Sequence, residues 1–176
     1  MPFFDTSQFT YALVTSTTYG TWLPGDERGF IDDEHNKFNA PFLRDKPGLK
    51  KSSQEAMPGT AVYFRQEHTK ILLGRWREIV EEYQWFLFAV AIMSNHFHLV
   101  VAAPGRVTKE TFLRNFKSRA SKCLNDQFGK QTWWTTSGSV RFCFEEQSLA
   151  ARIEYVKKQK NPLVVWVNPQ EFEILR

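Results

Sequence analysis

The pattern of hydrophobic and polar positions predicts five strands along the chain. Five segments combine strand length with β-branched and aromatic residues, and we predict strands at residues 9–17, 85–93, 96–103, 139–144 and 163–167. The second of these, WFLFAVAIM, is apolar throughout, which is typical of a central strand with both faces buried. Ser94 and Asn95 form a turn signal, so the third segment should be its hairpin partner, and the last should lie at a sheet edge.

Three other segments place apolar residues at steps of three and four, which predicts helices at 65–84, 107–129 and 146–160. Thr108 is positioned to cap the second helix and Gly129 to end it, and Asn161-Pro162 ends the third. Residues 30–62 are polar and interrupted by prolines and glycines, so we predict a long irregular insertion there.

The resulting order of elements is strand-helix-strand-strand-helix-strand-helix, with a final edge strand. It predicts an α+β fold and resembles the ferredoxin-like (RRM-like) arrangement, an antiparallel sheet with helices packed mainly on one face. A chain of 176 residues is long enough to bury a substantial core in one domain. We therefore predict a single domain over residues 1–176, with the insertion at about 30–62.

Composition and charge narrow the class of protein. The chain is 42% hydrophobic and 24% charged, as in ordinary globular proteins, and its net charge of +4 is compatible with a polyanionic partner without requiring one. Cys123 and Cys143 form neither a metal-binding spacing nor a disulfide framework. No segment has the pattern of a signal peptide or the length of a membrane span, so we expect a cytoplasmic protein with reduced thiols.

The stretch SNHFHLVV (94–101) contains two of the four histidines of the chain. On a strand, His96 and His98 point to one face, while Phe97 and Leu99 point to the other face and into a core. Two imidazoles side by side suit a divalent metal ion. The alternative is that both histidines lie on a solvated sheet face, and periodicity alone leaves both possibilities open.

The last predicted helix carries a tyrosine away from its apolar side. Leu149, Ile153 and Val156 form the apolar stripe, and Tyr155 projects roughly 125° away from it. Gln159 follows one helical turn later on nearly the same face. Together Tyr155 and Gln159 could supply a nucleophile and a third metal ligand, and the alternative is an ordinary solvated helix face.

These motifs resemble a known family. SNHFHLVV resembles the histidine-hydrophobic-histidine strand of the HUH single-strand endonucleases. Within that superfamily the chain is similar to the REP-associated tyrosine transposases, which use one catalytic tyrosine. Three further stretches fit, and the similarity covers most of the chain: YGTWLPGDERG (19–29), WWTTSGSVRF (133–142) and ARIEYVKKQKNPLVVW (151–166).

The resemblance implies that His96, His98 and Gln159 bind Mg²⁺ or Mn²⁺ and that Tyr155 is the catalytic nucleophile. Relatives often carry Asn-Pro four residues after the tyrosine, whereas here Asn161-Pro162 comes two residues later, so Gln159 fits the spacing better. The implied activity is cleavage and rejoining of single-stranded DNA near REP-like hairpins through a 5′-phosphotyrosine. The resemblance also implies a bacterial, nucleoid-associated protein, and it leaves open whether the chain is a monomer or a homodimer.

Several residues are candidates for DNA contacts. The second predicted helix is basic, which predicts phosphate contacts by Arg114, Lys117, Arg119 and Lys122. Trp133 and Trp134 are candidates for stacking on single-stranded bases. The alternatives are a solvated basic face and two core tryptophans.

Two other functions stay open at this stage. One is a hairpin-binding protein that has lost catalysis, although the presence of all the motif residues argues against it. The other is a metal-dependent phosphodiesterase that uses water as nucleophile, with the histidine pair and the acids of DERGFIDDEH (26–35) as ligands.

Overall fold

The computed structural model describes residues 4–23 and 46–169. In chain order, these form β1 (Phe9–Thr17), α1 (Pro47–Glu55), α2 (Gln66–Glu82), β2 (Phe86–Ile92), β3 (His96–Pro104), α3 (Lys109–Phe128), β4 (Ser139–Cys143), α4 (Glu146–Lys157) and β5 (Val164–Val167). All five predicted strands and all three predicted helices are present within a few residues of their predicted bounds.

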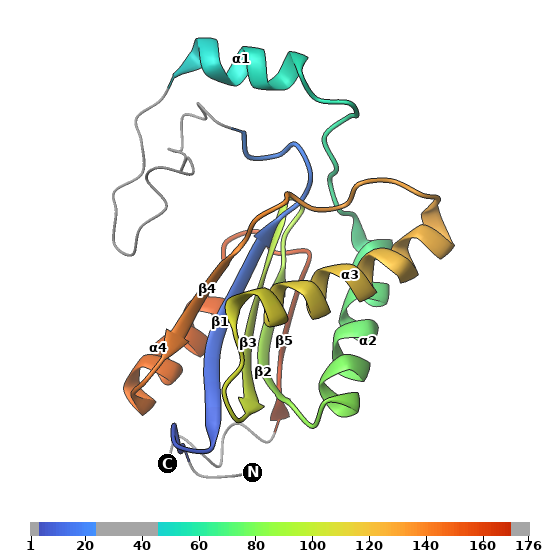
Figure 1. Cartoon of the computed structure of the whole chain (residues 1–176). Helices are drawn as coiled ribbons and strands as arrows, with labels where there is room; N and C mark the ends of the chain where they lie inside the picture. Colours follow the sequence, from blue (N-terminus) through green and yellow to red (C-terminus); the bar gives the residue numbers. More distant parts are fainter. Residues whose placement is uncertain (1–3, 24–45, 170–176) are drawn as a thin grey trace.

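The five strands make one antiparallel sheet in the order β4-β1-β3-β2-β5 (Figure 1). The predicted hairpin is formed by β2 and β3, and β3 lies in the middle of the sheet, where β1 is its other neighbour. β5 pairs with β2 and lies at one edge, as its short apolar sequence predicted.

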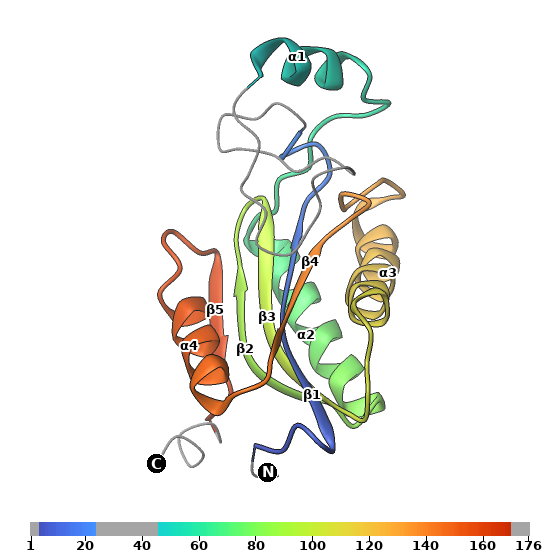
Figure 2. The same ribbon diagram turned by 60° about the vertical axis from the view of Figure 1, so that its left-hand side comes forward.

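Helices cover both faces of the sheet, and the distribution follows from the alternation along β3. Phe97 and Leu99 point toward α2 and α3, where they join one hydrophobic cluster. Val100 and Ala102 point the other way and join a second cluster with residues of α4. Figure 2 shows α4 on the opposite side of the sheet from α2 and α3. The predicted α+β fold, with most helices on one face, is confirmed.

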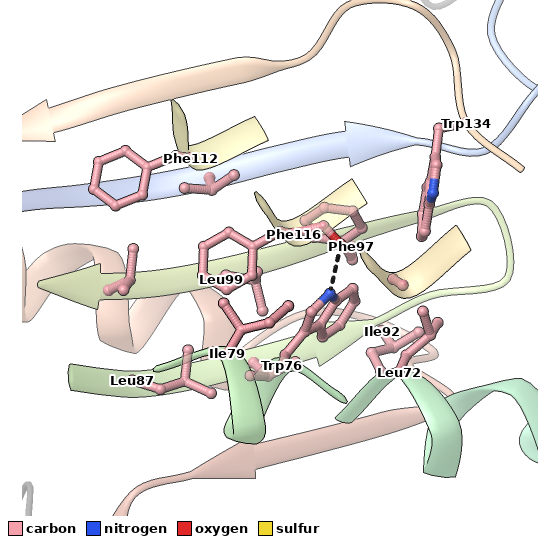
Figure 3. Close-up of a cluster of buried hydrophobic side chains, with 14 of the residues drawn as sticks. Leu72, Trp76, Ile79, Leu87, Ile92, Phe97, Leu99, Phe112, Phe116 and Trp134 are labelled. Carbon is pink, nitrogen blue, oxygen red and sulfur yellow. Dashed lines mark hydrogen bonds between the residues drawn. The ribbon is translucent and has the colours of Figure 1, made fainter. Parts of the chain in front are cut away.

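The larger cluster packs α2 and α3 against one face of the sheet (Figure 3). The Trp76 indole lies fully buried between α2 and the sheet, 4.7 Å from the Phe97 ring, and its N–H donates to the carbonyl oxygen of Phe116 at 3.0 Å. A buried indole stabilises a core through its large apolar area, provided that its N–H has an acceptor. This packing holds β3, and with it the histidine pair, in a defined place.

The helix ends agree with the capping signals. The Thr108 hydroxyl accepts a hydrogen bond from the backbone N–H of Thr111 at 3.3 Å, and Gly129 follows α3 with φ +88°, a conformation that favours glycine. α4 ends at Lys157, three residues earlier than predicted. None of the helices in the described parts of the chain is long and apolar enough to cross a membrane.

The predicted irregular insertion at 30–62 needs a correction. Part of it is the helix α1, which starts with Pro47 and buries none of its side chains. Proline is well tolerated in the first turn of a helix. Apart from Pro47, its only large apolar residue is Leu49, which is exposed, so the segment has too few apolar positions for helical spacing to be recognised, and this explains why the pattern did not predict it. The acidic segment 26–35 lies outside the described residues.

Candidate active site

The histidine pair lies near the start of β3, on the face that α4 covers. The rings of His96 and His98 point to the same side, as predicted, with centroids 4.9 Å apart and planes at 78°. Strand alternation sends the intervening Phe97 into the opposite core. The prediction that both imidazoles share one sheet face is therefore confirmed.

His98 is nearly buried, with 5% of its surface exposed. Its Nδ1 atom lies 2.8 Å from the hydroxyl of Thr15, which is directly opposite on β1. Burial lowers the pKa of His98 to about 3, and the neighbouring His96 adds to this effect. The imidazole is therefore neutral at pH 7, which is the form that binds a metal ion.

His96 is partly exposed at the mouth of the site. Its Nδ1 atom lies 2.6 Å from the side-chain oxygen of Asn95. In both histidines, then, Nδ1 contacts a polar side chain of the sheet or its turn. A partner at Nδ1 orients the ring and directs Nε2 toward a ligand, which is the usual arrangement around histidine metal ligands.

Tyr155 of α4 lies over this pair. Its ring centroid is 5.2 Å from that of His98, with the planes at 74°, and 47% of its surface is exposed. Leu149, Ile153 and Val156 form the buried stripe of α4, as predicted, and Tyr155 lies off it. The phenol is therefore close to the histidines and still accessible to a substrate.

Gln159 lies close to Tyr155 as predicted, but it is not on the helix. It follows the end of α4 instead of lying on it, because the helix stops at Lys157. Its side-chain amide N–H donates to the Tyr155 carbonyl oxygen at 3.1 Å, which folds the side chain back toward the tyrosine. Asn161 is exposed, with φ +54°.

A cavity of about 510 Å³ joins these groups. It is lined by Met93, His96, Glu154, Tyr155, Lys158, Gln159 and Lys160. His98 lies beside it, in ring contact with both His96 and Tyr155. The fold thus brings the four predicted active-site residues together from two segments that are distant in the sequence.

The donor set fits a divalent cation. Imidazole nitrogens bind divalent transition metals, while an amide oxygen, water and substrate phosphate are ligands that suit Mn²⁺ and Mg²⁺. Within residues 4–23 and 46–169, no group of three or more His, Cys, Asp or Glu side chains could hold a metal ion. The side-chain oxygen of Gln159, which lines the same cavity as His96, could supply a further ligand.

Two residues of the site carried no signal in the sequence. Thr15 stands in an ordinary strand pattern, and only the register of β1 against β3 places it beside His98. Glu154 lines the cavity and binds two lysines, with its carboxylate 2.5 Å from Lys157 Nζ and 3.3 Å from Lys158 Nζ. These two lysines lower the pKa of the Glu154 carboxyl.

The structure corrects the prediction that Lys117 contacts a phosphate. Its ammonium group donates to the backbone carbonyl oxygens of Thr135, Thr136 and Ser137 at 2.5, 3.1 and 3.0 Å. An ammonium has three N–H groups, and here all three have acceptors. Lys117 therefore fastens the loop before β4 to α3 and has no N–H left to donate to a phosphate.

The other basic residues of α3 differ in whether an acidic side chain is paired with them. Arg119 forms an ion pair with Glu82 and lies over the Tyr83 ring, 5.0 Å from its centroid. This acidic partner reduces the attraction of Arg119 for a phosphate, so its predicted role is weakened. Arg114 and Lys122 are exposed and stay candidates. Arg114 also lines a second cavity of about 510 Å³, between α3 and the loop before β4.

Trp133 and Trp134 are core residues, which corrects their predicted stacking role. They are 2% and 7% exposed, and Figure 3 shows Trp134 within the buried cluster. The Trp133 indole N–H donates to the Asn125 side chain at 2.8 Å, and that of Trp134 to the Ser121 hydroxyl at 2.8 Å. A base can stack only on an exposed ring face, and neither indole offers one.

The family follows from comparison with known sequences. A family model described as "Transposase IS200 like" matches residues 60–159, which is more than half of the chain. The chain belongs to this family of IS200-like transposases. The matched segment contains His96, His98, Tyr155 and, at its last position, Gln159. The family suggested by the sequence motifs is thereby confirmed.

Comparison with solved structures gives two similar folds. One is a REP-associated tyrosine transposase bound to a REP hairpin, with a TM-score of 0.45 and 9% identity over 88% of this chain and 67% of the other. The second is a candidate transposase from Deinococcus radiodurans, with a TM-score of 0.43 and 16% identity over 92% of this chain and 98% of the other. No curated protein matches the sequence.

Proposed function

We propose that this transposase is a metal-dependent single-strand DNA endonuclease and strand transferase with Tyr155 as its nucleophile. The observation that carries the proposal is the position of the half-exposed Tyr155 ring, 5.2 Å from the ring of the buried His98. A core tyrosine would lie on the buried stripe of α4, and a purely solvated one would have no reason to lie over a histidine pair. We propose His96, His98 and Gln159 as the ligands of Mg²⁺ or Mn²⁺.

The cleavage step follows from the chemistry of tyrosine. The Tyr155 oxygen attacks the phosphorus, the bond from phosphorus to the 3′ oxygen breaks, and the phenol proton leaves while the 3′ oxygen gains one. The products are a 5′-phosphotyrosine and a free 3′-OH. Because the covalent intermediate preserves the energy of the phosphodiester, the 3′-OH of another strand can reverse the step and join the DNA.

The remaining residues of the site prepare this step. A phenol is largely protonated at neutral pH and is then a weak nucleophile. A bound divalent cation would compensate by polarising the scissile phosphate and stabilising the charge of the transition state. Burial keeps His98 neutral, and Thr15 and Asn95 orient the two imidazoles. The Gln159 side-chain amide donates to the backbone carbonyl oxygen of Tyr155, which holds it next to the helix residue that carries the nucleophile.

We further propose single-stranded DNA next to REP-like hairpins as the substrate. Membership of a transposase family supports a DNA substrate, and the net charge of +4 is consistent with it. The cavity beside Tyr155 is lined by Lys158 and Lys160; Lys158 is paired with Glu154, and the charge of Lys160 would favour an anionic strand. Arg114 and Lys122 on α3 are proposed as further phosphate contacts.

A covalent adduct assay tests the proposal. A single-stranded hairpin oligonucleotide with a 3′ label is incubated with protein and Mn²⁺, and the products are separated on a denaturing gel. The label must be at the 3′ end, because Tyr155 would become attached to the downstream fragment. We expect a protein–DNA adduct from the wild type and from Tyr63→Phe, which changes another exposed tyrosine, and none from Tyr155→Phe.

Each other outcome identifies a different function. If Tyr155→Phe still forms the adduct, another residue is the nucleophile. If it cleaves without an adduct, water is the nucleophile and the protein is a phosphodiesterase. If the wild type binds the hairpin but does not cut it under any metal condition, the chain is a DNA-binding protein that has lost catalysis.

A further inference from the structure

A positively charged side chain that does not line the cavity, Arg152, lies beside Tyr155 on α4. Arg152 is one helical turn before Tyr155 on α4, so the two side chains are neighbours on the helix surface. The cavity is lined by residues at and after this turn of the helix and does not include Arg152. Arg152 therefore precedes Tyr155 on the helix surface, whereas Gln159 follows it.

The Arg152 side chain packs toward β4. Burial raises the pKa of the Cys143 thiol, and contacts with Ser148 and Arg152 oppose this rise, which places the Arg152 guanidinium at Cys143. The Arg152 Nε atom is buried and has no hydrogen-bond partner. A buried N–H without an acceptor is unfavourable, and a movement of the side chain toward a ligand with an anionic oxygen would relieve this cost.

Arg141 adds a second positive charge on the same face of the sheet. It stands two residues before Cys143 on β4, so strand alternation gives the two residues the same face. It also pairs in register with Leu13, whose side chain belongs to the cluster under α4. Arg141 is therefore on the same face as Cys143, which Arg152 contacts, and Arg141 is exposed.

Neither arginine has an acidic partner within residues 4–23 and 46–169. By contrast, four other cations of the helices have acidic partners. Lys157 and Lys158 share Glu154, and Arg75 and Arg119 share Glu82. An uncompensated arginine pair beside a candidate nucleophile is suited to bind a phosphate, because the guanidinium donates two parallel N–H bonds to phosphate oxygens.

We propose that Arg141 and Arg152 form a phosphate-binding site for the DNA linkage adjacent to the one that Tyr155 attacks. This inference rests on the proposed function. The strand would cross α4 with one phosphate at the arginine pair and the scissile phosphate between Tyr155 and the metal ligands. Such a contact would hold the scissile phosphorus in line with the phenol oxygen, so the arginines are positioning residues.

The test is a double-mutant cycle that combines changes in the protein with changes in the DNA. Binding is measured by fluorescence anisotropy in the non-cleaving Tyr155→Phe background, with and without Arg141→Gln and Arg152→Gln. The DNA is a single-stranded hairpin oligonucleotide in which one linkage at a time, on either side of the cut, is a neutral methylphosphonate. We expect each glutamine variant to weaken binding about tenfold, the loss of one charge-assisted contact.

One methylphosphonate position should weaken binding by a similar factor in the parent and have no further effect in the double arginine variant. The matched control is Arg106→Gln, which removes an exposed arginine just beyond the other end of β3 and should change nothing. Arg152→Lys keeps the charge without the fork and should recover part of the loss. Thermal unfolding of each variant checks that a weaker binder is still folded, and the exposed Arg141 tests the site if Arg152→Gln fails to fold.

The inference is wrong if the losses in affinity caused by the protein change and by the DNA change simply multiply at every linkage. It is also wrong if the arginine variants bind DNA like the parent. A wild type that binds DNA but forms no adduct would reject the proposed chemistry, and the binding cycle would still decide the arginine site. A parent that binds no single-stranded DNA would overturn both.

Discussion

The hydroxyl of Thr15 lies 2.8 Å from Nδ1 of His98, across the β1–β3 pair. If Nε2 of His98 is to bind a metal ion, Nδ1 must carry the proton and donate a hydrogen bond to the Thr15 hydroxyl oxygen. The threonine therefore has the place of a residue that orients a ligand and selects its tautomer.

Removing this hydrogen bond should weaken metal binding. We expect Thr15→Val, which keeps the shape of the side chain, to lower the affinity for Mn²⁺ by about tenfold or more. Thr15→Ser, which keeps the hydroxyl, should bind Mn²⁺ like the wild type. Isothermal calorimetry measures both. The double variant His96→Ala, His98→Ala should show no site at all, and equal Mn²⁺ affinity in all four proteins would remove the metal site from the proposal.

The buried neutral His98 should make the metal-free protein sensitive to acid. Its pKa is lowered to about 3 in the folded state, whereas an unfolded histidine titrates near its ordinary value. Below an ordinary histidine pKa of about 6.5, the unfolded chain therefore binds a proton that the folded chain does not, and stability falls as the pH falls. The loss continues until the pH reaches the folded-state pKa of about 3.

His98→Gln should remove this contribution. Between about pH 6 and 4, we expect the free energy of unfolding of the wild type to fall more steeply than that of the variant, by up to about 1.4 kcal/mol per pH unit. Urea titrations at several pH values in the presence of a chelator measure the two slopes. Parallel slopes would mean that His98 becomes protonated in the folded protein.

Lys117 should matter for stability, in contrast to its neighbour on α3. Lys117→Met leaves three carbonyl oxygens of the loop before β4 without their donor, and we expect it to lower the free energy of unfolding by roughly 1–2 kcal/mol. Lys122→Met removes an exposed lysine, so its effect should stay within about 0.5 kcal/mol. Denaturant unfolding compares the two, and equal small effects would show that the loop contacts are replaced by water without cost.

The salt dependence of DNA binding should distinguish the proposed phosphate contacts Arg114 and Lys122 from Lys117, which holds the loop. Each phosphate contact contributes up to about one unit to the slope of log K against log salt. We therefore expect Arg114→Gln and Lys122→Gln each to flatten the slope, and Lys117→Gln to leave it unchanged because its ammonium already donates to the loop. Anisotropy titrations at several salt concentrations give the slopes. A flatter slope for Lys117→Gln would return it to the phosphate contacts.

The local features of this protein could be predicted from its sequence. Strand periodicity was sufficient to give His96 and His98 one face, because alternation is a property of the strand itself. Helical spacing was sufficient to separate Tyr155 from the buried stripe of α4, and Thr108 marked the start of α3. Each of these depends on interactions within a few residues along the chain.

Other features were decided by contacts between distant segments. The register of β1 against β3 places Thr15 at His98, and the packing of the loop before β4 onto α3 buries Trp133 and occupies Lys117. A tryptophan or lysine has the same sequence signature whether it faces solvent, a core or a partner. Its surroundings depend on which elements pack together, so the fate of these side chains and the placement of Arg152 beside Cys143 emerged only from the tertiary structure.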